Sequence, residues 1–299
     1  MWFKNLKAYT LTDSLTLSPE QIAEKLNEHA FRACGKQELA TMGWVSPISG
    51  GSDMVHASGN RVWLKLKKQE RLLPATVINA ELAEKVAQIE QETGSPVGKK
   101  AQQDLKQEIV HRLLPQAFTK NSFIHGIVCL GDNLVLVDAS ADGTAELFLA
   151  TLRKAIESLP VLPLSRSSIA AHLTDWLQND NTPEGIELLE EAELKDMSEE
   201  GSVLRCKNQD LSAEEIINHI DKGKLVTKLS VSWDETLSCL LQEDVAIKRI
   251  KFADVLREQN DDIPKDQLAA KEDADFTLMV GELVRFVEYL KTQLQLTEE

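Results

Sequence analysis

The chain has 299 residues, of which 42% are hydrophobic and 27% are charged, and its formal net charge is −15 at pH 7. These fractions exclude a chain that is disordered throughout, and no apolar run reaches the roughly 18 residues of a membrane span. The first residues lack the basic and apolar regions of a secretory signal, so we expect none. The four cysteines are widely spaced and fit free thiols in a reducing cytoplasm: Cys34, Cys129, Cys206 and Cys239.

The negative charge is concentrated in two segments. Residues 171–222 hold 14 acidic and 4 basic residues, and residues 258–299 hold 11 and 4. Residues 61–120 instead hold 11 basic and 7 acidic residues. Two interpretations stay open: ordinary solvated faces, or an acidic exterior with a separate basic surface that binds a polyanion locally. The second predicts that the acidic segment 171–200 lies farther from the inner, basic surface than a set of six cations does: Lys65, Lys67, Lys228, Lys248, Arg249 and Lys251.

The chain begins with a predicted strand over residues 1–11. A helix is expected to follow from Ser18, because Ser18 and Gln21 form the pattern of a capping box and Pro19 suits the first helical position. Ser49-Gly50-Gly51-Ser52 lacks the context of a phosphate-binding loop and is interpreted as a turn.

Residues 61–67 alternate between apolar and polar side chains, which predicts a half-buried strand. Val62, Leu64 and Leu66 fall on the face expected to be buried. The face expected to be open carries Arg61, Trp63, Lys65 and Lys67.

The middle of the chain predicts more helices and a β-hairpin. Residues 75–114 have helical periodicity interrupted by a Gly-Ser-Pro sequence at 93–98, which indicates a projecting helical hairpin. The next expected elements are a β-hairpin over 123–137, a helix over 142–157 and an extended connection over 159–164 that we interpret as a domain boundary.

The second half predicts further strands and a long final helix. Residues 186–194 and 201–206 are expected to form two strands or a short helix–strand pair. A helix is expected to begin with a capping box at Ser212 and to end at Gly223. The three runs 224–233, 236–242 and 245–252 predict an antiparallel meander. The final helix has the apolar stripe Phe276, Met279, Val280, Leu283, Val287, Leu290 and Leu294.

Common catalytic and metal-binding motifs are absent from the sequence. It contains no HExxH, CxxC, GxxxxGK[ST], GxGxxG or GxSxG pattern. Asp273 and Asp275 could bracket a cation or form acidic surface, and both interpretations stay open. We therefore predict no metal and no cofactor. The absence of these motifs is weak evidence against an enzyme and stronger evidence against an NTP-driven machine.

Cations and one phenylalanine are the remaining candidates for function. Phe118 follows Pro115 in a polar turn, where it could stack on DNA bases or anchor the end of the helix to the core. Arg249 and Lys251 should share one face of a strand. The predicted DNA-binding residues are Lys65, Lys67, Lys68, Arg112, Phe118, Lys120, Lys207, Gln209, Lys224, Lys228, Lys248, Arg249 and Lys251.

Short sequences along the whole chain resemble, in order, the recombination-associated protein family RdgC of proteobacteria. They are WFKNL at 2–6, CG at 34–35, MGWV at 42–45, HRLLP at 111–115, AF at 117–118, LPV and PL within 159–164, EAELK at 191–195, QDL at 209–211, VTKL at 226–229 and DADF at 273–276.

Together, the elements along the chain predict an α+β protein with several lobes, antiparallel sheets, a projecting helical hairpin and a long C-terminal helix. The lobes would be a central region of 1–74 with 115–165, the hairpin 75–114, and a C-terminal region of 166–299. The resemblance implies that two such protomers form a ring around duplex DNA.

The resemblance also implies a cytoplasmic, nucleoid-associated homodimer without enzymatic activity. It would bind double-stranded and single-stranded DNA without sequence preference and antagonise recombination promoted by RecA. Phe118 matches a phenylalanine that projects toward DNA in the family. Lys207-Asn208 matches a basic pair with only one cation, and Gln116 stands where the family can have arginine.

Two other hypotheses stay open at this point. The chain could be an acidic protein–protein adaptor whose C-terminal helix binds a partner. It could also be a nuclease that holds a metal at Asp273 and Asp275.

Overall fold

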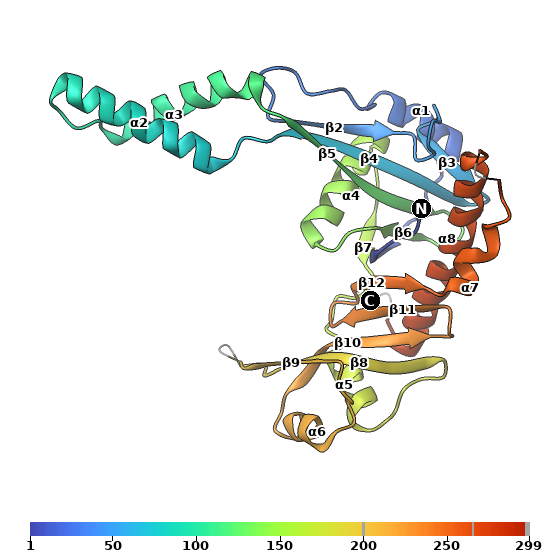
Figure 1. The fold of residues 1–299 in the computed structure, drawn as a ribbon. Coiled ribbons are helices and arrows are strands. Elements are labelled where there is room, and N and C mark those ends of the chain that lie inside the picture. Colours follow the sequence, from blue (N-terminus) through green and yellow to red (C-terminus); the bar gives the residue numbers. More distant parts are fainter. Residues whose placement is uncertain (199–200, 265, 297–299) are drawn as a thin grey trace. The chain divides into compact units, whose positions relative to one another are not determined.

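The computed structural model describes residues 1–198, 201–264 and 266–296 and has an α+β fold (Figure 1). Glu199 and Glu200, at the end of the predicted acidic segment, lie outside the described residues. The strands are β1 (Asn5–Leu11), β2 (Ala40–Val45), β3 (Val55–Ser58), β4 (Arg61–Arg71), β5 (Thr119–Cys129), β6 (Leu134–Val137), β7 (Val161–Pro163), β8 (Ile186–Lys195), β9 (Val203–Lys207), β10 (Leu225–Trp233), β11 (Leu237–Gln242) and β12 (Ile247–Phe252).

The helices match most of the predicted helical segments. They are α1 (Pro19–Asn27), α2 (Ala75–Thr93), α3 (Lys99–Leu113), α4 (Asp142–Ile156), α5 (Ala170–Gln178), α6 (Glu214–Asp221), α7 (Asp254–Arg257) and α8 (Leu268–Gln293), with short 3₁₀ turns η1 (Leu114–Gln116) and η2 (Glu258–Asn260). Among the described helices, none is both long and apolar enough to cross a lipid bilayer.

The chain forms two compact units. The large unit contains Met1–Glu28, Ser46–Lys65 and Ile124–Glu299, and the small unit contains His29–Val45 and Leu66–Phe123. Strands β4 and β5 each continue from one unit into the other. The division into three lobes expected from the sequence stays a prediction.

Antiparallel pairing builds the sheet of the large unit. Its strand order is β5-β6-β1-β12-β11-β10-β8-β9, with β3 paired to β4 and β7 paired to β1. Strands β10, β11 and β12 form the predicted meander, and β5 with β6 forms the predicted hairpin. The connection at 159–164 is extended as expected, and its residues 161–163 add a short strand to β1.

The long helix α8 supplies much of the core of the large unit. All seven residues of its predicted apolar stripe are buried. Burial of so many large side chains outweighs the modest helix propensity of the valine and phenylalanine residues in the stripe. The predicted long C-terminal helix is therefore confirmed.

The prediction that Trp63 lies on an open face of its strand is wrong. Trp63 is 1% exposed and stacks on Phe276 of α8, with ring centroids 5.3 Å apart and an interplanar angle of 12°. Its indole N–H donates to His125 Nδ1 at 3.2 Å. Alternation correctly separated the two faces of β4, but it did not reveal that α8 covers the second face.

The sequence predicts capping boxes at the start of two further helices, and one of the two is present. The capping box of α1 is present: Ser18 Oγ accepts from the Gln21 backbone N–H, and Gln21 Oε1 accepts from the Ser18 N–H. The capping box predicted at Ser212 is wrong, because α6 begins after Ala213 and the Ser212 hydroxyl donates to Asp210 instead. Asp210 competes successfully for this hydroxyl because it lies only two residues away.

The small unit contains the predicted pair of helices, α2 and α3, which pack side by side (Figure 1). Gly94 ends α2 with φ +65°, a conformation that glycine adopts without strain. Ile109 is the one buried residue that the two helices contribute among their described residues. Two helices alone bury little apolar surface, so this pair has a thin core.

Candidate nucleic-acid interface

Cations from three strands of the large unit lie on one face of the β8–β12 part of its sheet. We call this surface the cationic face and define it by Arg205, Lys207, Lys228, Lys248, Arg249 and Lys251. The opposite face carries buried residues such as Leu229, Val231 and Leu241, which belong to the core. Alternation along the strands therefore directs the polar side chains to the side away from the core.

Strand register places the cations in rows across the sheet. Arg205 of β9 lies opposite Glu193 of β8, Glu193 lies opposite Lys228 of β10, and Lys228 lies opposite Gln242 of β11. Side chains directly opposite each other on an antiparallel pair are close enough to interact. Lys207, two residues after Arg205, occupies the same face and lies opposite Glu191.

A second row adds hydroxyl groups. Lys251 lies opposite Ser238, which lies opposite Ser232 of the next strand. Hydroxyls among cations are common in surfaces that contact a phosphate backbone. Within the part of the chain that the structure describes, neither Lys248 nor Lys251 forms an ion pair.

Strand β12 is irregular at the point where it contributes two of these cations. Arg249 has φ +54° and its backbone N–H donates to Asn5 Oδ1 at 3.3 Å. Ile250 is buried between the exposed Arg249 and Lys251, so the expectation that these two cations share one face of the strand is confirmed. The pairing with β11 shifts register here, which indicates a β-bulge.

Two carboxylates lie among the cations. Glu193 pairs with Arg205 at 2.8 Å and with Lys228 at 2.9 Å. Glu191 pairs with Arg249 at 2.9 Å and has Lys207 at 3.9 Å. The cations of this face therefore have acidic neighbours, because β8 belongs to the acidic segment 171–200 and pairs directly with β9 and β10. The expectation that the basic residues lie closer to an inner surface than this segment does stays a prediction.

Two predicted site residues of the large unit are engaged elsewhere. Lys224 donates to the Ser202 carbonyl at 2.9 Å and to the Ser202 hydroxyl. Gln209 donates its side-chain amide to Glu215 at the start of α6. Both side chains hold local loop structure, and their role in DNA binding stays a prediction.

Lys65 lies near the half-buried His125 in the large unit. Burial and then the charge of Lys65 lower the pKa of His125 to about 3. His125 is therefore neutral at physiological pH. It accepts the hydrogen bond from Trp63 described above.

Phe118 is the most exposed large apolar side chain that the structure describes, at 84%. It follows the short turn η1 and precedes β5, in the small unit. Leu72, which is also exposed, donates its backbone N–H to the Phe118 carbonyl at 2.8 Å. The exposure excludes the interpretation of Phe118 as an anchor to the core.

Hydrogen bonds fix the turn that presents Phe118. Arg71 donates from Nη1 to the Ala117 carbonyl at 3.0 Å and from Nη2 to the Gly35 carbonyl at 3.1 Å. One guanidinium thus joins the turn before Phe118 to the loop at Gly35. The planar fork of donors in arginine suits this bridging of two acceptors.

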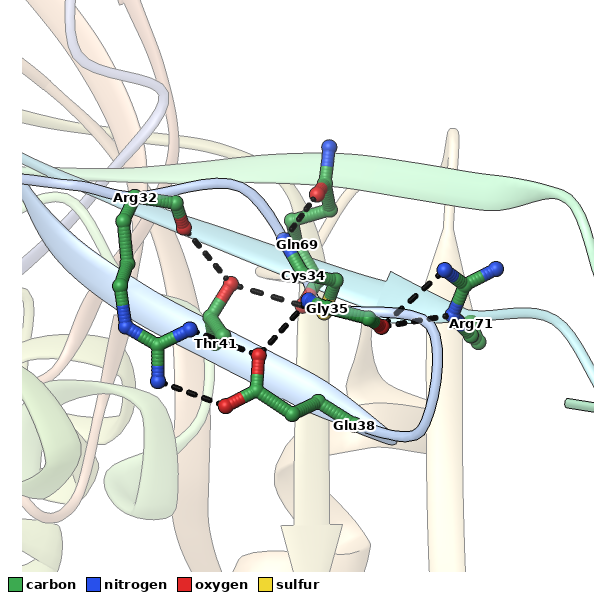
Figure 2. A network of polar contacts seen from close by, with 7 residues as sticks. All are labelled: Arg32, Cys34, Gly35, Glu38, Thr41, Gln69 and Arg71. Atoms are coloured by element: carbon green, nitrogen blue, oxygen red, sulfur yellow. Dashed lines mark hydrogen bonds and ion pairs between the residues drawn. The ribbon is translucent and has the colours of Figure 1, made fainter. Parts of the chain in front are cut away.

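The loop at Gly35 is itself held in place (Figure 2). Glu38 accepts two hydrogen bonds from Arg32, at 2.7 and 2.6 Å, and one from the Gly35 N–H at 2.7 Å. These bonds lower the pKa of Glu38 to about 2. Gln69 on β4 accepts from the Cys34 N–H at 2.8 Å, so the loop is attached to the strand that carries Arg71.

The other predicted cations of the small unit have varied surroundings. The Lys67 ammonium lies 4.2 Å from the centre of the Phe31 ring, and Lys68 pairs with Glu70 at 2.7 Å. Arg112 of α3 pairs with Glu81 of α2 and so links the two helices. Lys120 is exposed two residues after Phe118.

Asp273 and Asp275 do not converge on a common point. Asp273 pairs with His56 at 2.7 Å, whereas Asp275 is buried and accepts from Asn260 at 3.0 Å. Residues two apart on a helix point to different sides, which explains the separation. Across residues 1–198, 201–264 and 266–296, no group of three or more His, Cys, Asp or Glu side chains could hold a metal ion. The four cysteines are free thiols.

Two residues of the candidate interface were missed in the sequence. Arg205 has the same i, i+2 relation to Lys207 that drew attention to Arg249 and Lys251, so alternation along residues 201–206 could have found it. Arg71 is not among the predicted DNA-binding residues, and nothing in the sequence indicates that it bonds to two carbonyl groups.

Comparisons with known proteins agree with the resemblance. A family model described as "Putative exonuclease, RdgC" matches residues 1–297. "Recombination-associated protein RdgC" of Pseudoalteromonas atlantica is 62% identical over 290 residues, covering 97% of this chain and 96% of the relative. The protein of the same name from Aeromonas hydrophila is 44% identical over 292 residues, covering 97% of this chain and 96% of the relative. The one from Proteus mirabilis is 44% identical over 290 residues, covering 96% of each chain. The chain therefore belongs to the RdgC family of recombination-associated proteins.

Proposed function

We propose that the protein binds DNA without sequence preference, encircles the duplex as a dimeric ring and thereby limits recombination promoted by RecA. The observation that carries the proposal is the cationic face of the large unit. It gathers six cations and several hydroxyls onto a sheet surface, in a chain whose net charge is −15. Membership of a recombination-associated family supports DNA as the polyanion.

The chemistry of this face favours the phosphate backbone over base edges. Lysine, arginine and serine side chains on a broad sheet can contact phosphates, but they provide no helix or ribbon shaped for the major groove. Contacts of this kind position DNA and carry no sequence information. Exposed Phe118 adds an apolar group that can stack on a base or sugar face irrespective of sequence.

A second copy of this chain is the proposed partner of the α2–α3 pair. The helices carry a row of half-buried apolar side chains but bury only Ile109 among their described residues. Two such pairs packed together would bury those rows as a four-helix arrangement does. A ring requires a second contact about the same two-fold axis, which would close the assembly and prevent fibres.

Light scattering and DNA binding test these two parts of the proposal. We expect a dimer at micromolar concentration, and a monomer there would contradict the ring. We expect duplexes of unrelated sequence to bind with equal affinity and with log K falling linearly with log salt, by about 0.9 for each neutralised phosphate. Binding that is absent at low salt would instead favour the acidic adaptor.

The proposal assigns a binding role and no hydrolytic role. The separate engagement of Asp273 and Asp275 supports this assignment. Incubation with end-labelled single-stranded and double-stranded DNA and Mg²⁺ provides the test. Shortened products would support the nuclease hypothesis, and intact DNA would support binding alone. A RecA strand-exchange assay with increasing amounts of the protein would test the antagonism.

A further inference from the structure

Glu193 lies closer to the surface of the sheet than the two cations of the cationic face that pair with it. Its side chain is 15% exposed, whereas those of its partners Lys228 and Arg205 are 33% and 72% exposed. Burial alone would raise the pKa of Glu193, but the hydrogen bonds from Arg205 and Lys228 outweigh it and lower the pKa. The carboxylate is therefore ionised at neutral pH and neutralises charge within the face.

Glu191 repeats the arrangement two residues earlier on β8. Its side chain is 26% exposed and has Arg249 at 2.9 Å and Lys207 at 3.9 Å. Both cations are at least half exposed. Each carboxylate thus lies nearer the sheet, and the cations above it remain accessible to solvent.

We propose that Glu191 and Glu193 are internal competitors for the phosphates of DNA, so that they lower the affinity of the cationic face and set its salt dependence. This inference rests on the proposed DNA binding by that face. Four of the six cations have one of these carboxylates as a neighbour. A phosphate that approaches Lys228 or Arg249 meets a cation that already interacts with an anion of this chain.

Two opposite effects of the carboxylates have to be compared. They order flexible lysine and arginine side chains, which favours binding, and they cancel positive charge, which opposes it. Ion pairs at partly exposed positions are weak, so the ordering contributes little. The charge of the face acts on many phosphates at once, and the repulsion between carboxylate and phosphate extends over about 8 Å at physiological salt. Cancellation of charge therefore dominates.

The test compares the wild type with Glu191→Gln, Glu193→Gln and the double variant. Glutamine keeps the size of glutamate and one acceptor oxygen, replaces the other oxygen with an NH2 donor and removes the charge. Binding to a fluorescent duplex of arbitrary sequence is measured by anisotropy over a salt series. We expect each single variant to bind about two- to fivefold tighter at low salt, with a steeper dependence on salt.

Glu187→Gln is the matched control. Glu187 is exposed on the same strand and lies in the row of Ser232 and Lys251, but it forms no ion pair within the described part of the chain. We expect this control to change the affinity less than the two test variants do. Equal tightening by all three would show a general effect of net charge and would overturn the inference.

Thermal melting of each variant separates binding from folding. Unchanged or weaker DNA binding by a stably folded Glu191→Gln variant would overturn the inference while leaving the proposed function intact. If Glu193→Gln lowers the melting temperature strongly, the more exposed Glu191 carries the test alone. Wild-type protein that fails to bind any duplex would refute the proposed function, and the inference would fall with it.

Discussion

The guanidinium of Arg71 donates a hydrogen bond to the carbonyl of Ala117 at 3.0 Å, directly before the exposed Phe118. The backbone N–H of the next residue, Leu72, donates to the carbonyl of Phe118 itself at 2.8 Å. The carbonyls of both Ala117 and Phe118 are thus fixed by neighbouring residues at the end of β4. An exposed aromatic ring on a fixed backbone loses little conformational freedom when it binds a ligand.

Phe118→Ala should weaken DNA binding by about 5- to 150-fold, the range that corresponds to roughly 1–3 kcal/mol for stacking on a base. The ring is exposed, so its removal should leave the melting temperature and the dimer unchanged. Anisotropy and light scattering on the same samples provide the measurement. Lower thermal stability with normal DNA affinity would show that Phe118 supports the fold and that cations alone bind DNA.

Arg71→Lys should weaken DNA binding through the turn that presents Phe118. Lysine keeps the positive charge but cannot bridge the Gly35 and Ala117 carbonyls with the same planar geometry. We expect a loss of about three- to tenfold. In a double-mutant cycle with Phe118→Ala, the losses should be less than additive, because both changes remove the same interaction with DNA. Fully additive losses would show that Arg71 acts as an independent phosphate ligand.

Reversal of Arg249 and Lys251 to glutamate should weaken binding to all DNA sequences alike. Both side chains are exposed on the cationic face, and removal of each phosphate interaction should reduce the salt slope by about 0.9. The same reversal at Lys99 and Lys100, exposed at the start of α3, changes the net charge equally and serves as the control. An equal loss of affinity in both variants would mean that Arg249 and Lys251 have no special place in the interface.

The sequence predicts most helices and strands of this fold because its apolar residues recur at clear intervals. The stripe from Phe276 to Leu294 and the alternation in 225–252 both correspond to buried faces. The error at Trp63 has a physical cause: alternation assigns side chains to two faces, but it does not show what covers each face. Here α8, more than 200 residues later in the chain, covers the second face.

The candidate interface was predicted only in part for a similar reason. Counting charges by segment separated an acidic stretch from basic ones, yet antiparallel pairing places Glu193 of β8 between Arg205 and Lys228. Neighbours across strands depend on register, which is set by turns and bulges and not by local composition. Cations can therefore be found in a sequence, whereas their partners require the strand pairing.

A buried lysine in the large unit provides a test of stability. Lys7 of β1 lies 2.6 Å from Asp142 at the start of α4 and 2.6 Å from Asp244 between β11 and β12. Its side chain is only 10% exposed. Burial alone would lower the pKa of Lys7, but the two carboxylates outweigh it and raise the pKa. Burial alone would likewise raise the pKa of Asp244, and Lys7 lowers it.

Lys7→Met should lower the free energy of unfolding at pH 7 by about 1–2 kcal/mol, because it leaves two carboxylates close together while both remain partly solvated.

The lowered pKa of Asp244 stabilises the fold above the ordinary pKa of about 3.8, and this contribution is lost as the pH falls through the lowered value. The raised pKa of Lys7 stabilises the fold up to about pH 10.5, and this contribution is lost as the pH rises through the raised value. Urea unfolding of wild type and variant should therefore differ by a constant amount between about pH 4 and pH 10, and the difference should shrink below pH 4. The control Lys222→Met, at an exposed position, should leave the free energy of unfolding unchanged across this pH range. If the destabilisation by Lys7→Met stayed constant down to pH 2, the lost stability would come from packing and not from charge.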